Sequence, residues 1–167
     1  MPRFARLMRL ATAVFSISFV AAPAAAQSAN QALRAALGGC GEPCVIRYSP
    51  GGDVALFQAA AKAVRAGARR RVIIDGPCLS ACAIFADMVR SRVCITSRAS
   101  FGFHKASVFA VHTSSDGTGQ KLRLVAREDP PQSRDISNWV RRNGGFPTRG
   151  MRTMSNRQAA RFFRRCT

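Results

Sequence analysis

The chain has 167 residues, 47% of them hydrophobic, which is enough for one domain that buries a core of its own. Its 26 Lys and Arg face eight Asp and Glu, and the net charge of +18 favours an anionic partner such as lipopolysaccharide, anionic lipid, an acidic polymer or nucleic acid. No repeat, coiled coil or P-loop is present, and nucleic acid is disfavoured because no RNA- or DNA-binding signature accompanies the charge.

The N-terminus has the organisation of a secretory signal peptide. Three arginines within residues 3–9 precede the apolar run 10–22, and Ala24-Ala25-Ala26 supplies an A-x-A cleavage pattern. The apolar run is short for a membrane span, and no later segment approaches about 18 uninterrupted apolar residues. We therefore predict a signal peptide at 1–26 and a single soluble domain at 27–167, periplasmic or secreted. Only 23 Lys and Arg remain after cleavage, so the net charge of this domain is +15.

Six cysteines in an exported chain favour disulfides over free thiols. Four of them form two pairs with a spacing of four residues, Cys40 with Cys44 and Cys78 with Cys82. The other two, Cys94 and Cys166, have no cysteine nearby in the sequence. Local pairing within each C-x3-C pair is sterically possible, but the spacing does not choose the connectivity. A zinc site built from the two pairs is the alternative.

The first half of the domain alternates helical and strand patterns. Ala-rich spacing predicts a helix over 27–37, and apolar residues at helical spacing predict another over 54–65. β-Branched runs predict strands at 44–48 and 71–75, and the Gly-rich segment 49–53 is expected to turn. Strands that alternate with helices imply crossover connections, so the fold class expected is α/β with a mainly parallel sheet.

Ser80 lies in the stretch Gly76-Pro77-Cys78-Leu79-Ser80-Ala81-Cys82-Ala83, between the apolar run 72–74 and the helical pattern 83–89. This pattern predicts a strand, a tight turn and a helix that begins at the serine. The first N–H groups of a helix have no partner inside the helix, so they can hold an oxyanion that forms beside the serine. The structural alternative is that Ser80 is a helix N-cap.

The second half is less regular between residues 106 and 131. Before this region we expect strands at 93–96 and 100–104, and within it a polar loop at 113–119 and a strand at 122–126. After it we expect a helix at 132–142. A last helix is expected to start at the capping box Ser155–Gln158 and to run to about residue 164.

Three motifs occur in one order: Ser49-Pro50-Gly51-Gly52, then Ser80, then His104. Gly52 and Ser80 are 28 residues apart, and Ser80 and His104 are 24 apart. This order and spacing resembles the Clp protease proteolytic subunit and its Clp/crotonase-fold relatives, in particular small exported Clp-like proteins with a C-x-S-A-C serine motif. The resemblance covers residues 45–105 well and 151–163 weakly.

The resemblance implies that Ser80 attacks an acyl carbon, that His104 takes its proton, and that the backbone N–H groups of Gly52 and Ala81 form the oxyanion hole. The residue types suit this chemistry, because a serine hydroxyl needs a base near pH 7 and imidazole has a suitable pKa. The mechanism needs no cofactor and no metal.

Two departures from the family's pattern stand out. The family's aspartate would fall at Met151, so either Asp135, Asp129 or Asp116 orients His104, or the pair works as a dyad, or the fold serves another purpose. The strand that normally precedes the S-P-G-G strand is not found. We therefore expect the N-terminal part of the sheet to be incomplete and to expose an edge that favours pairing with another chain.

Other candidate residues have simpler interpretations. His112, beside the polar loop, is expected to be solvated. Cys78 and Cys82 flank Ser80, and a disulfide that braces the turn is favoured over a Cys-His nucleophile. Phe101 and Phe103 are expected in the core, with a wall of an apolar substrate pocket as the alternative.

The function expected is an exported Clp-like serine hydrolase that cleaves peptide or small ester bonds. Since no ATP-driven unfoldase is expected outside the cytoplasm, its substrates would be short, unfolded or small. The alternative is a catalytically degenerate Clp/crotonase-fold protein that acts as a basic binding module for an anionic lipid or polymer, with its densest charge at Arg161, Arg164 and Arg165. A third possibility is a degenerate Clp-like protein that has no activity at all. In each of the three cases the protein is a possible homo-oligomer.

Overall fold

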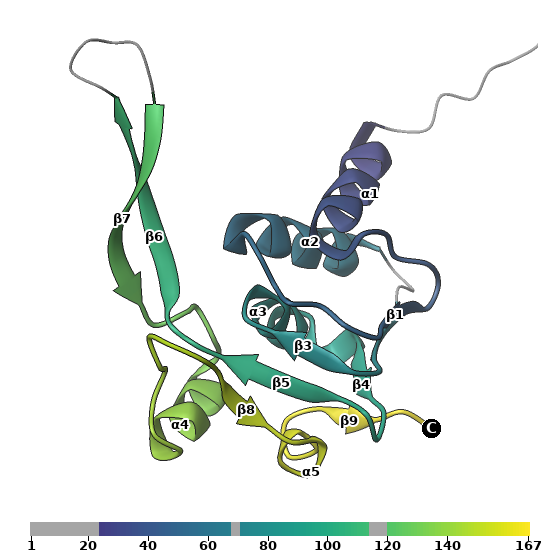
Figure 1. The fold of residues 1–167 in the computed structure, drawn as a ribbon. Helices are drawn as coiled ribbons and strands as arrows, with labels where there is room; N and C mark the ends of the chain where they lie inside the picture. The colour runs from purple at the N-terminus through teal and green to yellow at the C-terminus, as the bar shows by residue number, and fades with distance from the viewer. Residues whose placement is uncertain (1–23, 68–70, 114–119) are drawn as a thin grey trace, which may run out of the picture.

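The computed structural model describes residues 24–67, 71–113 and 120–167 (Figure 1). The helices are α1 (Ala24–Leu37), α2 (Val54–Ala66), α3 (Ala81–Met88), the short 3-10 helix η1 (Arg90–Arg92), α4 (Arg134–Arg142) and α5 (Asn156–Ala159). The strands are β1 (Cys44–Ile46), β2 (Val72–Ile74), β3 (Pro77–Leu79), β4 (Val93–Ile95), β5 (Ser100–Phe103), β6 (Ala106–Thr113), β7 (Gln120–Glu128), β8 (Arg152–Met154) and β9 (Arg164–Arg165). Most of the predicted signal peptide lies outside the described residues. In the part of the chain that the structure describes, no helix is both long and apolar enough to span a bilayer.

A parallel sheet with strand order β1-β2-β4-β9 forms one half of the scaffold. Val72 of β2 is in register with Cys44 on one side and with Val93 on the other. Val72 and Ile74 point to the same face of β2 and are fully buried, whereas Ile73 on the other face is partly buried. The mixed α/β fold with a parallel sheet is therefore confirmed.

β1 is an edge strand of this sheet, and within residues 24–67 only helix α1 precedes it. The expected incompleteness of the sheet relative to the Clp/crotonase fold remains a prediction. Helix α2 begins where predicted because Asp53 caps it: the Asp53 carboxylate accepts from the N–H groups of Ala55 at 2.7 Å and Leu56 at 3.2 Å.

A second sheet, β3-β5-β8, begins where the sequence predicted only a tight turn. After β2 the chain passes Gly76 and enters strand β3. The prediction that the chain turns directly from β2 into the helix was therefore wrong. Gly76 is needed because a Cβ there would lie 1.8 Å from the Arg47 carbonyl oxygen. Pro77 is tolerated because it is the first residue of its strand, where its missing N–H is not required. β3 is paired with the chain after β1, since the Ser49 N–H donates to the Pro77 carbonyl at 2.9 Å.

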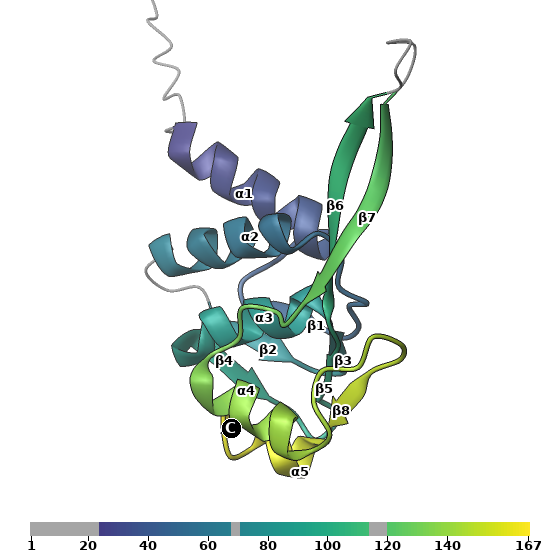
Figure 2. The same ribbon diagram turned by 90° about the vertical axis from the view of Figure 1, so that its left-hand side faces the viewer.

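Strands β6 and β7 form an antiparallel hairpin that projects away from the two sheets (Figures 1 and 2). The predicted strand 122–126 is part of β7, but β6 was missed. The predicted polar loop lies almost wholly outside the described residues. In both views the hairpin extends at the end of the molecule that carries α1 and α2, whereas α4 and α5 lie at the other end.

The C-terminal segment closes the parallel sheet. Gln158 Oε1 accepts from the Ser155 N–H at 2.9 Å, as expected of the capping box, but helix α5 ends at Ala159 and is shorter than predicted. The chain then turns so that Phe163 stacks on Phe101, with ring centroids 4.7 Å apart, and β9 joins β4. The residues predicted as the last turns of this helix are therefore not helical, because Phe163 is buried and the chain pairs with β4 as strand β9.

All six cysteines form disulfides, with the pairs Cys40–Cys44, Cys78–Cys82 and Cys94–Cys166. The alternative of a zinc site was wrong, because within each C-x3-C pair the two sulfur atoms form a disulfide with one another. Three disulfides fit an oxidising, extracellular or periplasmic location.

Candidate active site

Ser80 occupies the junction between β3 and α3 in an unusual backbone conformation. Its φ is 55° and its ψ is −122°, and among the described residues it is the one non-glycine residue with positive φ. Ser80 is the N-cap residue of α3, as the structural alternative expected, but its side chain makes no capping hydrogen bond to the helix. Strain of this kind concentrates at functional sites, because it persists only where surrounding contacts impose it.

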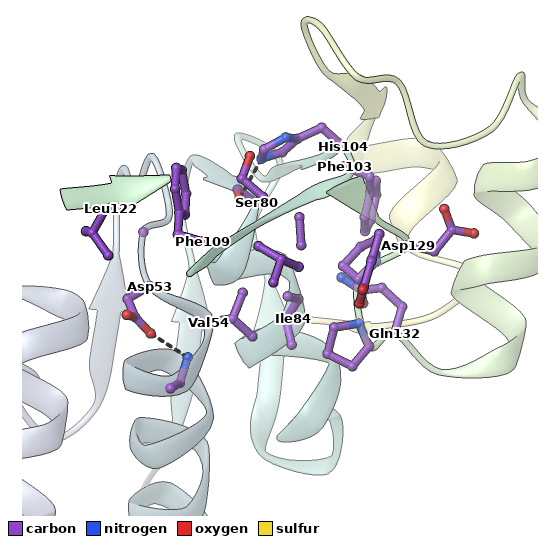
Figure 3. A pocket seen from close by; sticks show the side chains of 18 residues that line it. Asp53, Val54, Ser80, Ile84, Phe103, His104, Phe109, Leu122, Asp129 and Gln132 are labelled. Atoms are coloured by element: carbon purple, nitrogen blue, oxygen red, sulfur yellow. Dashed lines mark hydrogen bonds between the residues drawn. The ribbon is translucent and has the colours of Figure 1, made fainter. Parts of the chain in front are cut away.

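His104 lies next to Ser80, with 2.7 Å between its Nε2 and the serine Oγ (Figure 3). The sheet produces this proximity. β3 and β5 are parallel neighbours in which Leu79 is in register with Gly102, and the Ser80 N–H donates to the Gly102 carbonyl at 2.8 Å. The residues that follow the two strands therefore meet at the same edge of the sheet.

The Ser49-Pro50-Gly51-Gly52 turn packs directly against the serine. A Cβ on Gly51 would lie 2.7 Å from Ser80 Cβ and 2.9 Å from the Ala81 nitrogen, so only glycine permits this approach. Gly52 and Ser80 line the same cleft. Within the described residues, no group accepts a hydrogen bond from the N–H of Gly52 or of Ala81, the first residue of α3. The assignment of these two N–H groups to an oxyanion hole remains a prediction.

The disulfide Cys78–Cys82 spans the Ser80 junction. Cys78 belongs to β3 and Cys82 to the first turn of α3, and both residues are completely buried. The predicted brace of the turn is therefore present. A Cys-His nucleophile is wrong, because neither sulfur is a thiol.

Two of the three predicted orienting carboxylates are engaged elsewhere. Asp135 binds Arg90 through both of its oxygens, at 2.6 and 3.0 Å, and the Arg90 guanidinium holds the pKa of Asp135 far below its usual range. Asp129 lines the cleft but is exposed and pairs with Arg141 at 3.4 Å. Asp116 lies outside the described residues. Within the described residues, no carboxylate hydrogen bonds to the second ring nitrogen of His104.

Met151, at the position of the family's aspartate, lies beside the strand that leads to His104. A Cβ on Gly102 would be 3.3 Å from the Met151 sulfur, and Met151 is 40% exposed. The position is thus close to the site, but its thioether cannot accept strongly from imidazole. The described residues of the site form a serine–histidine dyad.

The environment of His104 favours the neutral form of its imidazole. The pKa of His104 is below its ordinary value, first because the ring is partly buried and second because the Arg127 cation disfavours a second positive charge. Arg127 is held in place by a hydrogen bond from its Nη1 to the Thr148 carbonyl at 3.0 Å. A neutral ring whose Nε2 contacts the hydroxyl can accept the serine proton at pH 7.

Ser80 and His104 open into a cleft of about 850 Å³ between the hairpin, the N-termini of α2 and α3 and the segment after β7. Figure 3 shows Val54 and Ile84 on the helical side of this cleft and Phe109 and Leu122 on the hairpin side. Phe101 is in the core, as expected. Phe103 is buried too, and it also lines the cleft, so the alternative of a pocket wall applies to it. The hairpin wall was missed, because Phe109 and Leu122 carry no motif. His112 is exposed, as expected.

Within the described residues, no group of three or more His, Cys, Asp or Glu side chains could hold a metal ion. Comparisons with models of protein families, with curated proteins and with solved structures find no match.

Proposed function

We propose that this protein is an exported serine hydrolase that uses Ser80 as nucleophile and His104 as base. The observation that carries the proposal is the 2.7 Å contact between Ser80 Oγ and His104 Nε2, made by a serine in a strained junction at the edge of a cleft. We also propose the Clp/crotonase type for the fold. Its support is the order of the S-P-G-G turn, Ser80 and His104 along the chain, together with the packing of that turn on the serine.

The dyad can perform acyl transfer in two steps. Ser80 Oγ attacks the carbonyl carbon while its proton passes to His104 Nε2, and the negative charge on the carbonyl oxygen is stabilised by the N–H groups of Gly52 and Ala81. The leaving amine or alcohol takes the proton from His104 and departs, which leaves an acyl-serine. A water molecule then gives a proton to His104 as it attacks this ester, and the serine is regenerated with release of the acid.

With no orienting carboxylate among the residues that the structure describes, His104 depends on packing for its orientation. It directly follows the buried strand β5, and the adjacent Lys105 N–H donates to the Pro147 carbonyl at 3.0 Å. In serine proteases, loss of the orienting carboxylate lowers turnover by roughly 10⁴. We therefore expect slow turnover on activated, short or small substrates, either peptides or esters, that fit the open cleft.

The test is hydrolysis of p-nitrophenyl esters and short fluorogenic peptides by the disulfide-bonded protein. We expect Ser80→Ala and His104→Ala each to lower kcat/KM by at least about 10³, because the two groups act as a unit. The matched control is Ser97→Ala, which removes an exposed hydroxyl outside the cleft and is expected to leave kcat/KM unchanged. Equal hydrolysis by folded Ser80→Ala and wild-type protein would exclude Ser80 as the nucleophile.

A further inference from the structure

The β6–β7 hairpin exposes a ladder of apolar side chains. Five of the nine large hydrophobic residues that are exposed in the described part of the chain lie on these two strands. Phe109 is in register with Leu124, and Val111 with Leu122, so these four side chains share one face of the hairpin. Their exposed fractions are 56% for Phe109, 44% for Leu124, 61% for Val111 and 68% for Leu122. We call these four residues the hairpin ladder.

The opposite face of the hairpin is basic. Arg123 is in register with Ala110, and Lys121 with His112, which places these side chains on the face away from the hairpin ladder. All four are exposed. Within the described strands of the hairpin, the one acid is Glu128, the last residue of β7, so no acid lies on the part that carries Lys121 and Arg123.

The hairpin ladder is not packed on the rest of the domain. A two-stranded sheet normally gains stability by burying one face on a core, and a hairpin alone is marginal in water. Here the strands project from the body in both views (Figures 1 and 2), and one residue of each pair in the ladder, Phe109 and Leu122, borders the cleft. The combination of an apolar face and a basic face is the strand equivalent of an amphipathic interfacial helix.

We propose that the hairpin binds the surface of an anionic lipid bilayer. The hairpin ladder enters the boundary between headgroups and acyl chains, and Lys121 and Arg123 extend their aliphatic stems along the hairpin so that their charges reach lipid phosphates. Such a surface offers hydrocarbon and negative charge together. A nucleic acid would satisfy the cations but leave the ladder in water, and a second copy of a domain with net charge +15 after the predicted cleavage would bring like charges together.

The test is co-sedimentation of the oxidised protein with vesicles of phosphatidylcholine alone and of phosphatidylcholine with phosphatidylglycerol. We expect binding to the anionic vesicles, weak binding to the zwitterionic ones, and weakening of the anionic binding by 1 M salt, where the Debye length falls to about 3 Å. Lys121→Gln with Arg123→Gln should weaken partitioning about 25-fold, at roughly fivefold per cation. Val111→Thr with Leu124→Thr, which lie outside the cleft lining, should weaken it by about tenfold.

The matched control removes two cations from the other end of the molecule. Arg157 and Arg161 are exposed and lie at and just after α5, so Arg157→Gln with Arg161→Gln should keep at least half of the wild-type binding. Equal loss in this control, or unchanged binding after the ladder substitutions, would overturn the proposal. So would a dimer without vesicles that the ladder substitutions dissociate. Ser80→Ala should bind vesicles like the wild type, so this proposal and the hydrolase can fail separately.

Discussion

Ser80 combines a strained backbone with a side chain that contacts His104 and makes no capping hydrogen bond to helix α3. A non-glycine residue in such a conformation costs about 1–3 kcal/mol, and here the hydrogen bond to Gly102 and the Cys78–Cys82 disulfide keep it in place. The conformation turns Ser80 Oγ away from the helix N–H groups and toward His104. The strain therefore fits a role in chemistry better than a role in starting helix α3.

The pH dependence of activity tests the environment of His104. The protonated ring cannot accept the serine proton, so kcat/KM on a short soluble ester should rise with pH through the pKa of His104. Burial and the Arg127 cation lower this pKa, so the midpoint should lie below the ordinary histidine value of about 6.5. In Arg127→Gln the midpoint should move upward, because one of the two causes of the lowered pKa is removed.

Arg123→Gln is the matched control for the pH experiment. This substitution removes a cation of β7, the strand that also carries Arg127, but Arg123 is not a cause of the lowered pKa of His104. We therefore expect the midpoint of the pH profile of Arg123→Gln to equal that of the wild type. A downward shift in Arg127→Gln, or a wild-type midpoint above 6.5, would contradict the account of His104.

At the scale of elements, the turn between β1 and α2 positions the site by direct contact with the β3–α3 junction. We predict that Gly51→Ala lowers kcat/KM by about 10²–10³, because the new Cβ must displace the Ala81 nitrogen or the Ser80 side chain. It should also lower the free energy of unfolding by about 2–4 kcal/mol, through overpacking and a φ of +86°. Steady-state kinetics and chemical denaturation measure the two effects.

Gly38→Ala separates backbone strain from the clash. Gly38 ends α1 with a φ of +69°, and a Cβ there meets nothing within 4 Å. We expect a loss of about 1 kcal/mol in unfolding free energy and no change in kcat/KM. If Gly51→Ala behaves like Gly38→Ala, the turn does not position the Ser80 site.

The order and spacing of the motifs, through the resemblance, predicted that Ser80 and His104 act together, and the parallel strands β3 and β5 bring the two residues to the same edge of the sheet. The sequence was not sufficient for β3, because Gly76-Pro77 is typical of a turn. Pro77 is accepted only because it is the first residue of its strand and Gly76 lets the Arg47 carbonyl approach. β6 was missed because both of its faces are exposed, so its sequence lacks the regular apolar and polar alternation of a half-buried strand.

At the scale of the whole molecule, covalent links hold together segments that are far apart in the sequence. The Cys94–Cys166 disulfide joins residues 72 positions apart, and restriction of the unfolded chain by such a link is worth about 4 kcal/mol. It ties the C-terminal segment, including β9, to β4 of the parallel sheet. Closure of the sheet by this segment could not be predicted, because cysteine spacing alone leaves the connectivity open.

The cleft is also a property of the whole molecule. Its walls come from α2, α3, the hairpin and the segment after β7, and their side chains converge only in the folded domain. The ordered motifs in the sequence predicted a site at Gly52, Ser80, Ala81 and His104, whereas the apolar wall at Phe109 and Leu122 depends on where the hairpin projects. The absence of an aspartate at Met151 was visible in the sequence, and Asp135 proved to serve the Arg90 ion pair instead.

The most direct test of the account is the site of covalent labelling by a fluorophosphonate, determined by peptide mass spectrometry on the disulfide-bonded protein. We predict one adduct per chain on Ser80, no adduct in Ser80→Ala, and labelling slowed by about 10³ in His104→Ala. Labelling of another residue at the wild-type rate, or equal labelling of wild-type protein and folded Ser80→Ala, would contradict the proposed dyad.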